Sequence, residues 1–153
     1  MRRILIIVGG ALVALGLLAA VLAFALPWAS YRMRLRRGGW AEEDFFSVFE
    51  IRRGTWFVVA LVLLMVLALA AAVGVERVRQ VAGMAAPVVG LIAAALVVAV
   101  MQSQIGDQRI EVELGGLADA RVRWAGGAVF GLAATPLLGF GAGLLSIGRT
   151  RGA

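Results

Sequence analysis

The side chains able to do chemistry are arginines and carboxylates, and they concentrate in two segments, 27–55 and 102–124. The run Glu-Glu-Asp at 42–44 is an acidic cluster, but three consecutive carboxylates do not converge on one cation, so a solvated turn is favoured over a calcium site. Glu111 and Glu113 alternate with apolar residues, which differs from a glycosidase pair facing each other across a cleft. No catalytic pair is predicted.

The composition restricts the chemistry further, because the chain has no histidine and no cysteine. Histidine is the commonest general base and a common zinc and haem ligand, and cysteine supplies thiol redox pairs and thiolate metal sites. These absences argue against a haem cytochrome, a zinc protease or a thiol oxidoreductase as an activity of this chain alone. We expect no cofactor, no metal and a non-enzymatic role.

Four uncharged apolar stretches separate the polar segments, at 4–26, 56–75, 85–101 and 125–147. A bilayer core about 30 Å thick is crossed by roughly 20 apolar residues of helix. Hydrophobic residues make up 62% of the 153, which exceeds the share in an ordinary soluble domain. The sequence therefore predicts one domain, a membrane-embedded bundle of four helices, with the lipid bilayer as its surroundings.

The first stretch also resembles a secretory signal peptide, with Arg2 and Arg3 before it and small residues at 23 and 25. It is longer than the roughly 7–15 apolar residues of such a peptide, so we expect a retained helix. The net charge of +6 comes from fifteen arginines in short segments, which suits lipid headgroups better than nucleic acid.

Four spans place both termini on one side of the membrane, and basic residues favour the cytoplasmic side. Arg2 and Arg3 precede the first span and Arg77 and Arg79 lie in the short second connection, which predicts cytoplasmic termini in a plasma (inner) membrane. Four arginines directly after the first span, at 32, 34, 36 and 37, argue for the opposite orientation.

Tryptophans mark one boundary of the predicted bundle. Trp28 ends the first span, Trp56 begins the second and Trp124 precedes the fourth. All three lie on the same side of the membrane, where the two longer connections are expected. Amphipathic rings favour the headgroup layer, so these three residues are predicted interface anchors. Trp40 lies in the loop on the same side.

Small residues are spaced for close helix packing. Gly127 and Gly131 are four residues apart, as are Gly139 and Gly143, and this spacing lets helix backbones approach closely in lipid. The first span carries three further glycines for the same purpose, Gly9, Gly10 and Gly16.

A proline interrupts the fourth span. Pro136 removes a backbone donor and crowds the carbonyl of Leu132, which predicts a kink. Thr135 is placed to satisfy the freed carbonyl groups.

Two segments of the longer connections alternate in polarity as half-buried strands do. Residues 31–36 place apolar residues on one face and arginines on the other, and residues 109–114 place apolar residues opposite glutamates. Residues 48–52 and 121–124 are shorter strand candidates, and the acids at 42–44 followed by Phe45 favour a short interfacial helix as an alternative.

These segments predict a small antiparallel sheet formed by the two extracytoplasmic connections, 27–55 and 102–124. Unlike charges opposed across a sheet contribute about 0.2–1 kcal/mol per pair. We expect the arginines of one strand to face the glutamates of the other, with the apolar face of the sheet covering the helix ends.

The layout resembles the claudin-type four-helix architecture and small four-span proteins of GC-rich bacteria. The shared features are Pro27-Trp28, an Arg-Arg-Gly-Thr-Trp sequence ending at Trp56, and Arg-Trp-Ala-Gly at 123–126. Trp40 follows Gly39, but the leucine and the two cysteines of the claudin signature are absent. The resemblance implies architecture only, with outer sheets that contact neighbouring proteins.

We expect a protein that acts by association, with a copy of itself or within a larger membrane complex. The predicted contact residues are Arg32, Arg34, Arg36, Trp40, Glu111 and Glu113, since buried arginine and tryptophan are frequent interface hot spots. The alternative is a small oligomeric channel or transporter component with an arginine-lined vestibule. A surface enzyme acting on lipid-linked substrates lacks a nucleophile–base pair.

Overall fold

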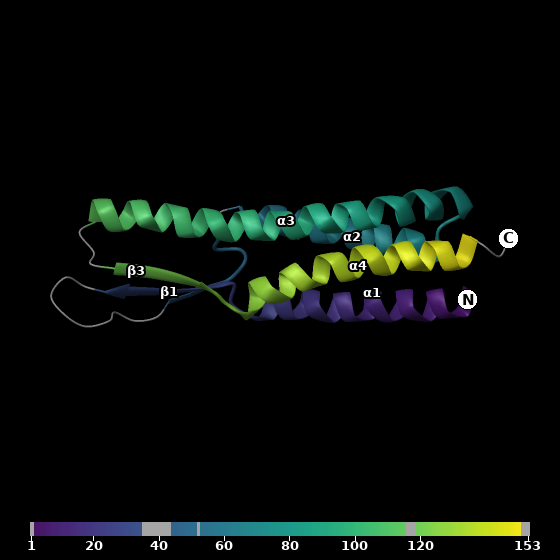
Figure 1. The fold of residues 1–153 in the computed structure, drawn as a ribbon, viewed down its shortest axis with the longest axis horizontal. Coiled ribbons are helices and arrows are strands. Elements are labelled where there is room, and N and C mark those ends of the chain that lie inside the picture. The colour runs from purple at the N-terminus through teal and green to yellow at the C-terminus, as the bar shows by residue number, and fades with distance from the viewer. Residues whose placement is uncertain (1, 35–43, 52, 116–118, 151–153) are drawn as a thin grey trace.

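The computed structural model describes residues 2–34, 44–51, 53–115 and 119–150; of these, residues 32–34, 44, 105–115, 119–121 and 150 are described by their backbone. Four helices and three strands follow one another along the chain (Figure 1). The elements are α1 (Arg2–Ala25), β1 (Ala29–Arg34), β2 (Asp44–Phe46), α2 (Gly54–Val73), α3 (Glu76–Gly115), β3 (Asp119–Trp124) and α4 (Gly126–Thr150).

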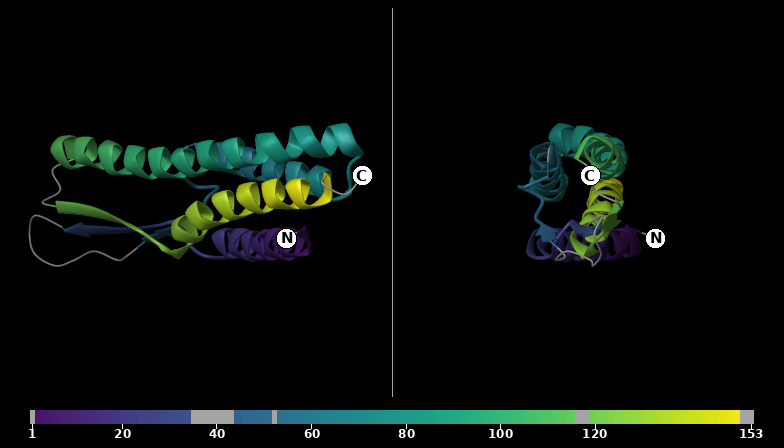
Figure 2. Two further views of the ribbon diagram at one scale, coloured as in Figure 1. Left: turned by 45° about the vertical axis from the view of Figure 1, so that its right-hand side comes forward. Right: turned by 90° about the vertical axis from the view of Figure 1, so that its left-hand side faces the viewer.

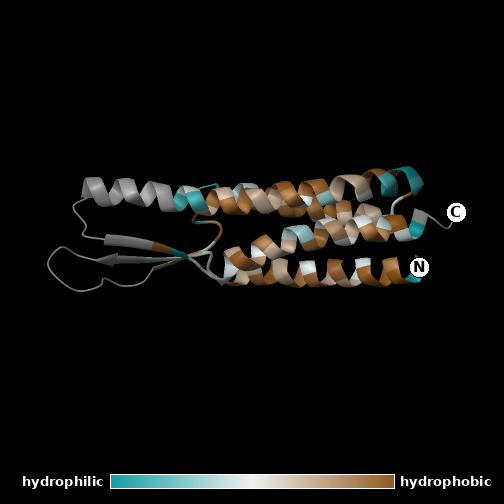
Figure 3. Cartoon of the chain, in the orientation of Figure 1, coloured by the Kyte–Doolittle hydropathy of each residue, from teal (hydrophilic) through white to brown (hydrophobic). Residues whose placement is uncertain are grey.

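Across the described residues, four helices are long and apolar enough to cross a bilayer, which is the number that the sequence predicts. The qualifying segments are Arg2–Ala25, Gly54–Val73, Glu76–Gln104 and Gly126–Arg149. Apolar residues cover most of their length (Figure 3). Burial within the protein is low in α1 and α2, so many of these apolar side chains face outwards.

Helix α4 holds the bundle together, because it contacts each of the other three helices. In the end-on view α4 lies between α1 on one side and the α2–α3 pair on the other (Figure 2). α4 accordingly has the most buried candidate span, 56% against 22% for α1.

The longest helix contradicts one predicted strand. α3 runs without a break through residues 109–114, so the strand expected there is wrong. Extending an existing helix adds one hydrogen bond per residue without a new nucleation step, and Gln, Arg, Glu and Leu are good helix formers. α3 ends at Gly115, and glycine is a poor helix former.

Residues 105–115 form what we call the α3 extension. At about 1.5 Å per residue the 40 residues of α3 span about 60 Å, against about 36 Å for the 24 residues of α1. The α3 extension and the sheet therefore project together past the ends of α1 and α4 (Figure 1).

A three-stranded antiparallel sheet in the order β2-β1-β3 confirms that both longer connections build one sheet. β1 and β3 overlap the strands expected at 31–36 and 121–124. The strand expected at 48–52 is wrong, because residues 48–50 form a turn and β2 lies earlier. The short helix considered from residue 42 onwards is also wrong at 44–46, because these residues form β2. Residues 42 and 43 lie outside the described residues.

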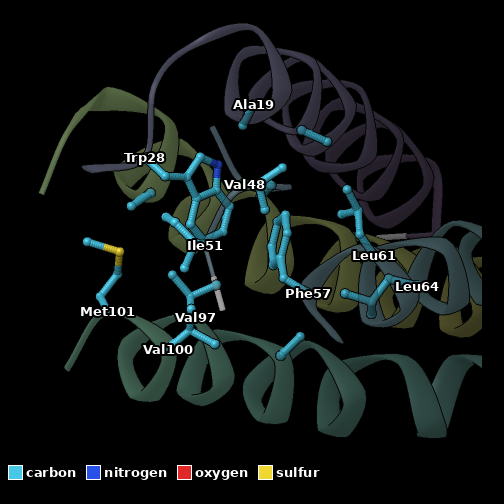
Figure 4. Close-up of a cluster of buried hydrophobic side chains, with 14 of the residues drawn as sticks. Ala19, Trp28, Val48, Ile51, Phe57, Leu61, Leu64, Val97, Val100 and Met101 are labelled. Carbon is cyan, nitrogen blue, oxygen red and sulfur yellow. The ribbon is translucent and has the colours of Figure 1, made fainter. Parts of the chain in front are cut away.

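The core lies where the sheet meets the bundle. One cluster of buried side chains joins Trp28 to Val48 and Ile51 of the first connection, Phe57 of α2 and Val97 of α3 (Figure 4). Leu61 and Leu64 continue it along α2. This cluster ties the sheet rigidly to the helices that would lie in lipid.

Candidate interaction surface

The register of the sheet assigns its residues to two faces. Opposed residues share a face, and residues alternate between faces along each strand. Ala29 lies opposite Phe46 and Trp124, and Tyr31 lies opposite Val122. Together with Met33 they make one face predominantly apolar.

The apolar face is turned to α3. Ala29 and Tyr31 are buried, and Val122 and Trp124 pack on the cluster that contains Val97 and Met101 of α3. β3 and α3 are in contact along this side. The apolar face therefore packs on helix residues, as expected. It packs mainly along one long helix, α3, and not across the ends of several helices.

The second face is rich in arginine, and we call it the arginine face. Register places Arg32 opposite Arg121, Ser30 opposite Arg123, and Arg34 opposite Asp119. β2 adds one aromatic residue, since Phe45 lies opposite Ser30. The arginine face is defined by Ser30, Arg32, Arg34, Phe45, Asp119, Arg121 and Arg123, so it includes one acid beside the four arginines.

The predicted pairing of arginines with glutamates across the sheet is wrong. Arg32 faces another arginine, and like charges directly opposed destabilise a sheet. Glu111 and Glu113 belong to a helix, where two residues apart means about 200° around the axis, so they do not share a face. Arg36 and Trp40 lie outside the described residues.

The two large side chains described on the arginine face are exposed. Arg123 is exposed and Phe45 is 61% exposed, while the small Ser30 between them is buried. Sequence reasoning missed Phe45, Arg121 and Arg123 as contact residues. The alternation of Asp119-Ala-Arg-Val-Arg-Trp124 is the signal that marks Arg121 and Arg123, because it repeats the period of β1. The sequence holds no comparable signal for Phe45.

Trp28 joins the sheet to the bundle. Its backbone N–H donates to Phe46 O at 2.8 Å, and its carbonyl accepts from Ala125 N at 2.9 Å. Its indole Nε1–H donates to Ala23 O at 2.7 Å, and its ring meets Phe57 edge-on at a centroid distance of 4.7 Å. Every polar group of Trp28 is therefore used inside the protein.

The tryptophans differ from the anchors expected at this boundary. Trp28 is wrong as a lipid anchor, because its exposure is 0%. Trp124 is half-buried against the core cluster. Trp56 is 62% exposed at the start of α2, and Phe49, stacked on Phe24 at 6.0 Å, is 65% exposed nearby in sequence. Trp56 and Phe49 are therefore exposed aromatic residues at this boundary.

The first glycine pair of α4 makes room for Trp28. A methyl group at Gly131 would lie 3.0 Å from Trp28 Cζ2 and 3.2 Å from Phe57 Cζ. One at Gly127 would collide with the carbonyl of Leu26. Both positions therefore need glycine because the chain leaving α1 crosses α4 here.

The second pair faces α3. A methyl group at Gly139 would lie 2.6 Å from Ala86 O, and one at Gly143 would lie 3.1 Å from Pro87 Cγ. On α1, Gly9 and Gly16 meet α4 in the same way, whereas Gly10 has nothing within 4 Å. α4 therefore uses different glycines for different neighbours.

Pro136 lies inside α4, as expected. The Thr135 hydroxyl donates to the Leu132 carbonyl at 3.3 Å, which satisfies the group that the proline ring deprives of its donor. Thr135 is wholly buried, so this bond also gives its buried hydroxyl a hydrogen-bond partner.

A short turn connects β2 to α2. The backbone N–H and the hydroxyl of Ser47 donate to Glu50 Oε2 at 2.6 and 2.8 Å. These two hydrogen bonds hold the pKa of Glu50 below its ordinary value, the backbone bond having the larger effect. Arg53 adopts a left-handed conformation, φ 69°, and its side chain is exposed. Gly54 passes close to Val48, and a methyl group at Gly54 would collide with the Val48 carbonyl.

The opposite end of the bundle carries a second group of arginines, which includes Arg2, Arg3, Arg77 and Arg79. Arg2 Nε donates to Gly148 O at 3.1 Å, and Arg79 Nη2 donates to Gly74 O at 2.9 Å. Both bonds satisfy carbonyls at or just beyond helix C-termini. Arg3 and Arg77 remain exposed, so these two are free to meet a membrane surface.

Within the described ranges, no group of three metal-ligating side chains gathers in one place. What the arrangement offers is recognition: a cationic, partly aromatic sheet face held rigidly at one end of the bundle. Comparison of the chain with protein-family models, with curated proteins and with solved structures finds no match.

Proposed function

We propose that this chain is a non-enzymatic integral membrane protein that acts by associating with another protein through the arginine face. The observation that carries the proposal is the register of Arg32 against Arg121. Like charges opposed across a sheet are unfavourable on their own. A face that keeps this arrangement is best explained by an acidic surface that covers it in the working state.

The composition of the face also suits a protein partner. Arginine and aromatic residues dominate the energetically important positions of protein interfaces. Arg123 and the 61%-exposed Phe45 flank the same buried serine, so a cation and an apolar ring are offered side by side.

The membrane setting completes the proposal. The four apolar helices span a plasma membrane, the termini lie in the cytoplasm, and the sheet and the α3 extension project outside. Exposed Arg3 and Arg77 on the terminal side support this orientation through the positive-inside rule. The claudin-like layout remains part of the proposal as an architecture only.

Cross-linking in native membranes tests the association. Wild-type protein and an Arg121→Glu, Arg123→Glu variant are cross-linked, solubilised gently and compared, with Arg53→Glu as the control. Arg53 is exposed at the same end of the bundle but lies off the sheet. We expect a cross-linked species with the wild type and the control that is lost in the double variant. Recovery of an isolated monomer alone from wild-type membranes would refute the proposal.

A second candidate is an anion-conducting oligomer, favoured by the same row of arginines, since rings of arginine select anions. Purified protein in liposomes would then pass chloride, and the Arg121→Glu, Arg123→Glu variant would lose or invert this selectivity. Tight vesicles with the wild-type protein would leave association as the sole role.

A further inference from the structure

The association proposed above leaves the acidic partner open, and the chain itself carries a matching surface. The α3 extension contains Asp107, Glu111 and Glu113 against one basic residue, Arg109, which gives three negative charges and one positive, or −2. The strands β1 and β3 contain four arginines against Asp119, or +3. Among the described residues, these two regions carry most of the charge in the projecting part of the molecule.

Within one copy these surfaces lie on opposite sides. α3 packs against the apolar face of the sheet, so the sheet itself separates the α3 extension from the arginine face. The acids of a copy are therefore poorly placed to neutralise its own arginine face.

The two surfaces do reach the same distance from the bundle. The α3 extension runs alongside β1 and β3 in the views of Figures 1 and 2, beyond the ends of α1 and α4. Two copies held upright in one membrane would present them at the same height. A neighbour beside the arginine face then meets it with an acidic helix without any tilt or vertical shift.

The direction of the strands argues against lipid headgroups as the anion. The strands run along the long axis of the molecule (Figure 1), and the 6 residues of β1 rise about 20 Å at about 3.3 Å each. The headgroup layer on each side of a bilayer is only about 5–8 Å deep. Most of the arginine face thus stands clear of it.

We infer that the arginine face docks against the α3 extension of a second copy of this chain in the same membrane. The inference rests on the proposed function and specifies its partner. Because one surface meets a different surface, the contact is heterologous, and repeated copies form a closed ring or a row. Phe45 supplies an apolar contact within the charged interface.

A charge exchange tests this contact directly. One variant carries Arg121→Glu and Arg123→Glu. The other carries Asp107→Arg and Glu111→Arg, which are four residues apart and so share one side of the helix. Each alone opposes like charges, so we expect self-association in detergent or nanodiscs to weaken about tenfold or more. Mixed together, the two variants offer unlike charges at every contact, and oligomers containing both are expected to return.

Disulfide trapping gives a readout that does not depend on charge. The chain has no native cysteine, so Arg123→Cys in one tagged copy and Gln104→Cys in another introduce single thiols. Gln104 directly precedes the α3 extension and lies close to the height of Arg123, because the end of β3 packs near Met101. We expect a disulfide-linked heterodimer in membranes. The control replaces Arg123→Cys by Arg53→Cys, which lies off the arginine face and should give no such product. Circular dichroism of every variant checks that the helices are retained.

The outcomes separate this inference from the broader proposal. One outcome is that the wild type associates, but the charge exchange leaves association unchanged and the thiol pair forms no disulfide. The second-copy inference is then overturned, and association with another acidic protein stands. If wild-type protein is monomeric and binds nothing in membranes, both are overturned.

Discussion

At the scale of single residues, Trp28 contributes most to the structure of the sheet–bundle junction. It is fully buried, its backbone bonds reach β2 and the start of α4, and its indole bonds to Ala23 at the end of α1. A tryptophan next to a span boundary would ordinarily be assigned to lipid. Here the space left by Gly131 and Gly127 admits the ring to the interior instead.

Replacing Trp28 should therefore destabilise the protein strongly. Trp28→Ala removes a fully buried aromatic side chain, and we expect a loss of about 3 kcal/mol or more in unfolding free energy. Trp28→Phe keeps most of the ring volume but loses the bond to Ala23 O, at about 1 kcal/mol. Denaturant unfolding in detergent micelles measures both.

The matched control is Trp56→Ala, since Trp56 is 62% exposed. Its unfolding free energy should change much less than that of Trp28→Ala. Equal losses at the two positions would mean that Trp28 is not the buried junction residue.

The turn between β2 and α2 gives a pH-dependent prediction. The pKa of Glu50 is lowered in the folded state, so the turn gains stability above the unfolded pKa and loses it as pH falls through the folded value. Ser47→Ala removes the hydroxyl donor but keeps the backbone donor, so the pKa of Glu50 should rise part of the way towards normal. Carboxyl chemical shifts followed by NMR titration measure it, and an unchanged pKa would contradict the assigned cause.

At the scale of helices and strands, α4 shows how small residues select neighbours. The methyl-to-carbonyl distance of 2.6 Å at Gly139 means that the backbones of α3 and α4 touch there. Burial from water adds no force inside lipid, so such close backbone contact is what holds helices together. The bundle depends on these few positions more than on its many outward-facing apolar side chains.

A larger residue at Gly139 should separate α3 from α4. Gly139→Leu overfills the contact, and we expect a destabilisation of about 1–3 kcal/mol. Gly10→Leu is the control, because nothing lies within 4 Å of that position and helix propensity favours leucine over glycine by up to about 1 kcal/mol. Thermal unfolding of the two variants side by side should show opposite shifts; shifts of the same sign and size would disprove the contact.

The elements differ in how far the sequence predicts them. The four helices follow from length and apolarity alone, and β1 and β3 follow from alternation. Residues 109–114 alternate equally well, but they follow directly on an established helix, and its continuation outcompetes a short strand. Six residues of alternation do not distinguish the two, because the outcome depends on what precedes them.

The candidate surface was less predictable than the elements that carry it. The arginines at 32 and 34 were predicted as contact residues, yet which residues face them depends on the register between β1 and β3. Register arises from pairing between segments far apart in the chain, with Trp28 and Gly127 fixing where β1 starts relative to α4. No local pattern encodes that alignment.

At the scale of the whole molecule, the two ends of the bundle differ in kind. One end carries the projecting sheet and α3 extension, and the other carries both termini and helix ends bonded by Arg2 and Arg79. The orientation of the chain in the membrane therefore decides whether the arginine face lies in the cytoplasm or outside it. Topology is the property on which an outer association role depends.

Reporter fusions test this topology. A fluorescent protein that matures only in the cytoplasm should be bright at the C-terminus, and a periplasmically active phosphatase inserted in the segment 35–43 should be active. Since Arg3 and Arg77 are exposed, they contribute to orientation without internal bonds, so Arg3→Glu with Arg77→Glu should raise the inverted fraction. Arg53→Glu, on the sheet side, removes a competing positive charge and should lower it. A C-terminus outside the cell in the wild type would turn the arginine face towards the cytoplasm. The α3 extension of a neighbouring copy would turn with it, so the contact between copies would then form on the cytoplasmic side.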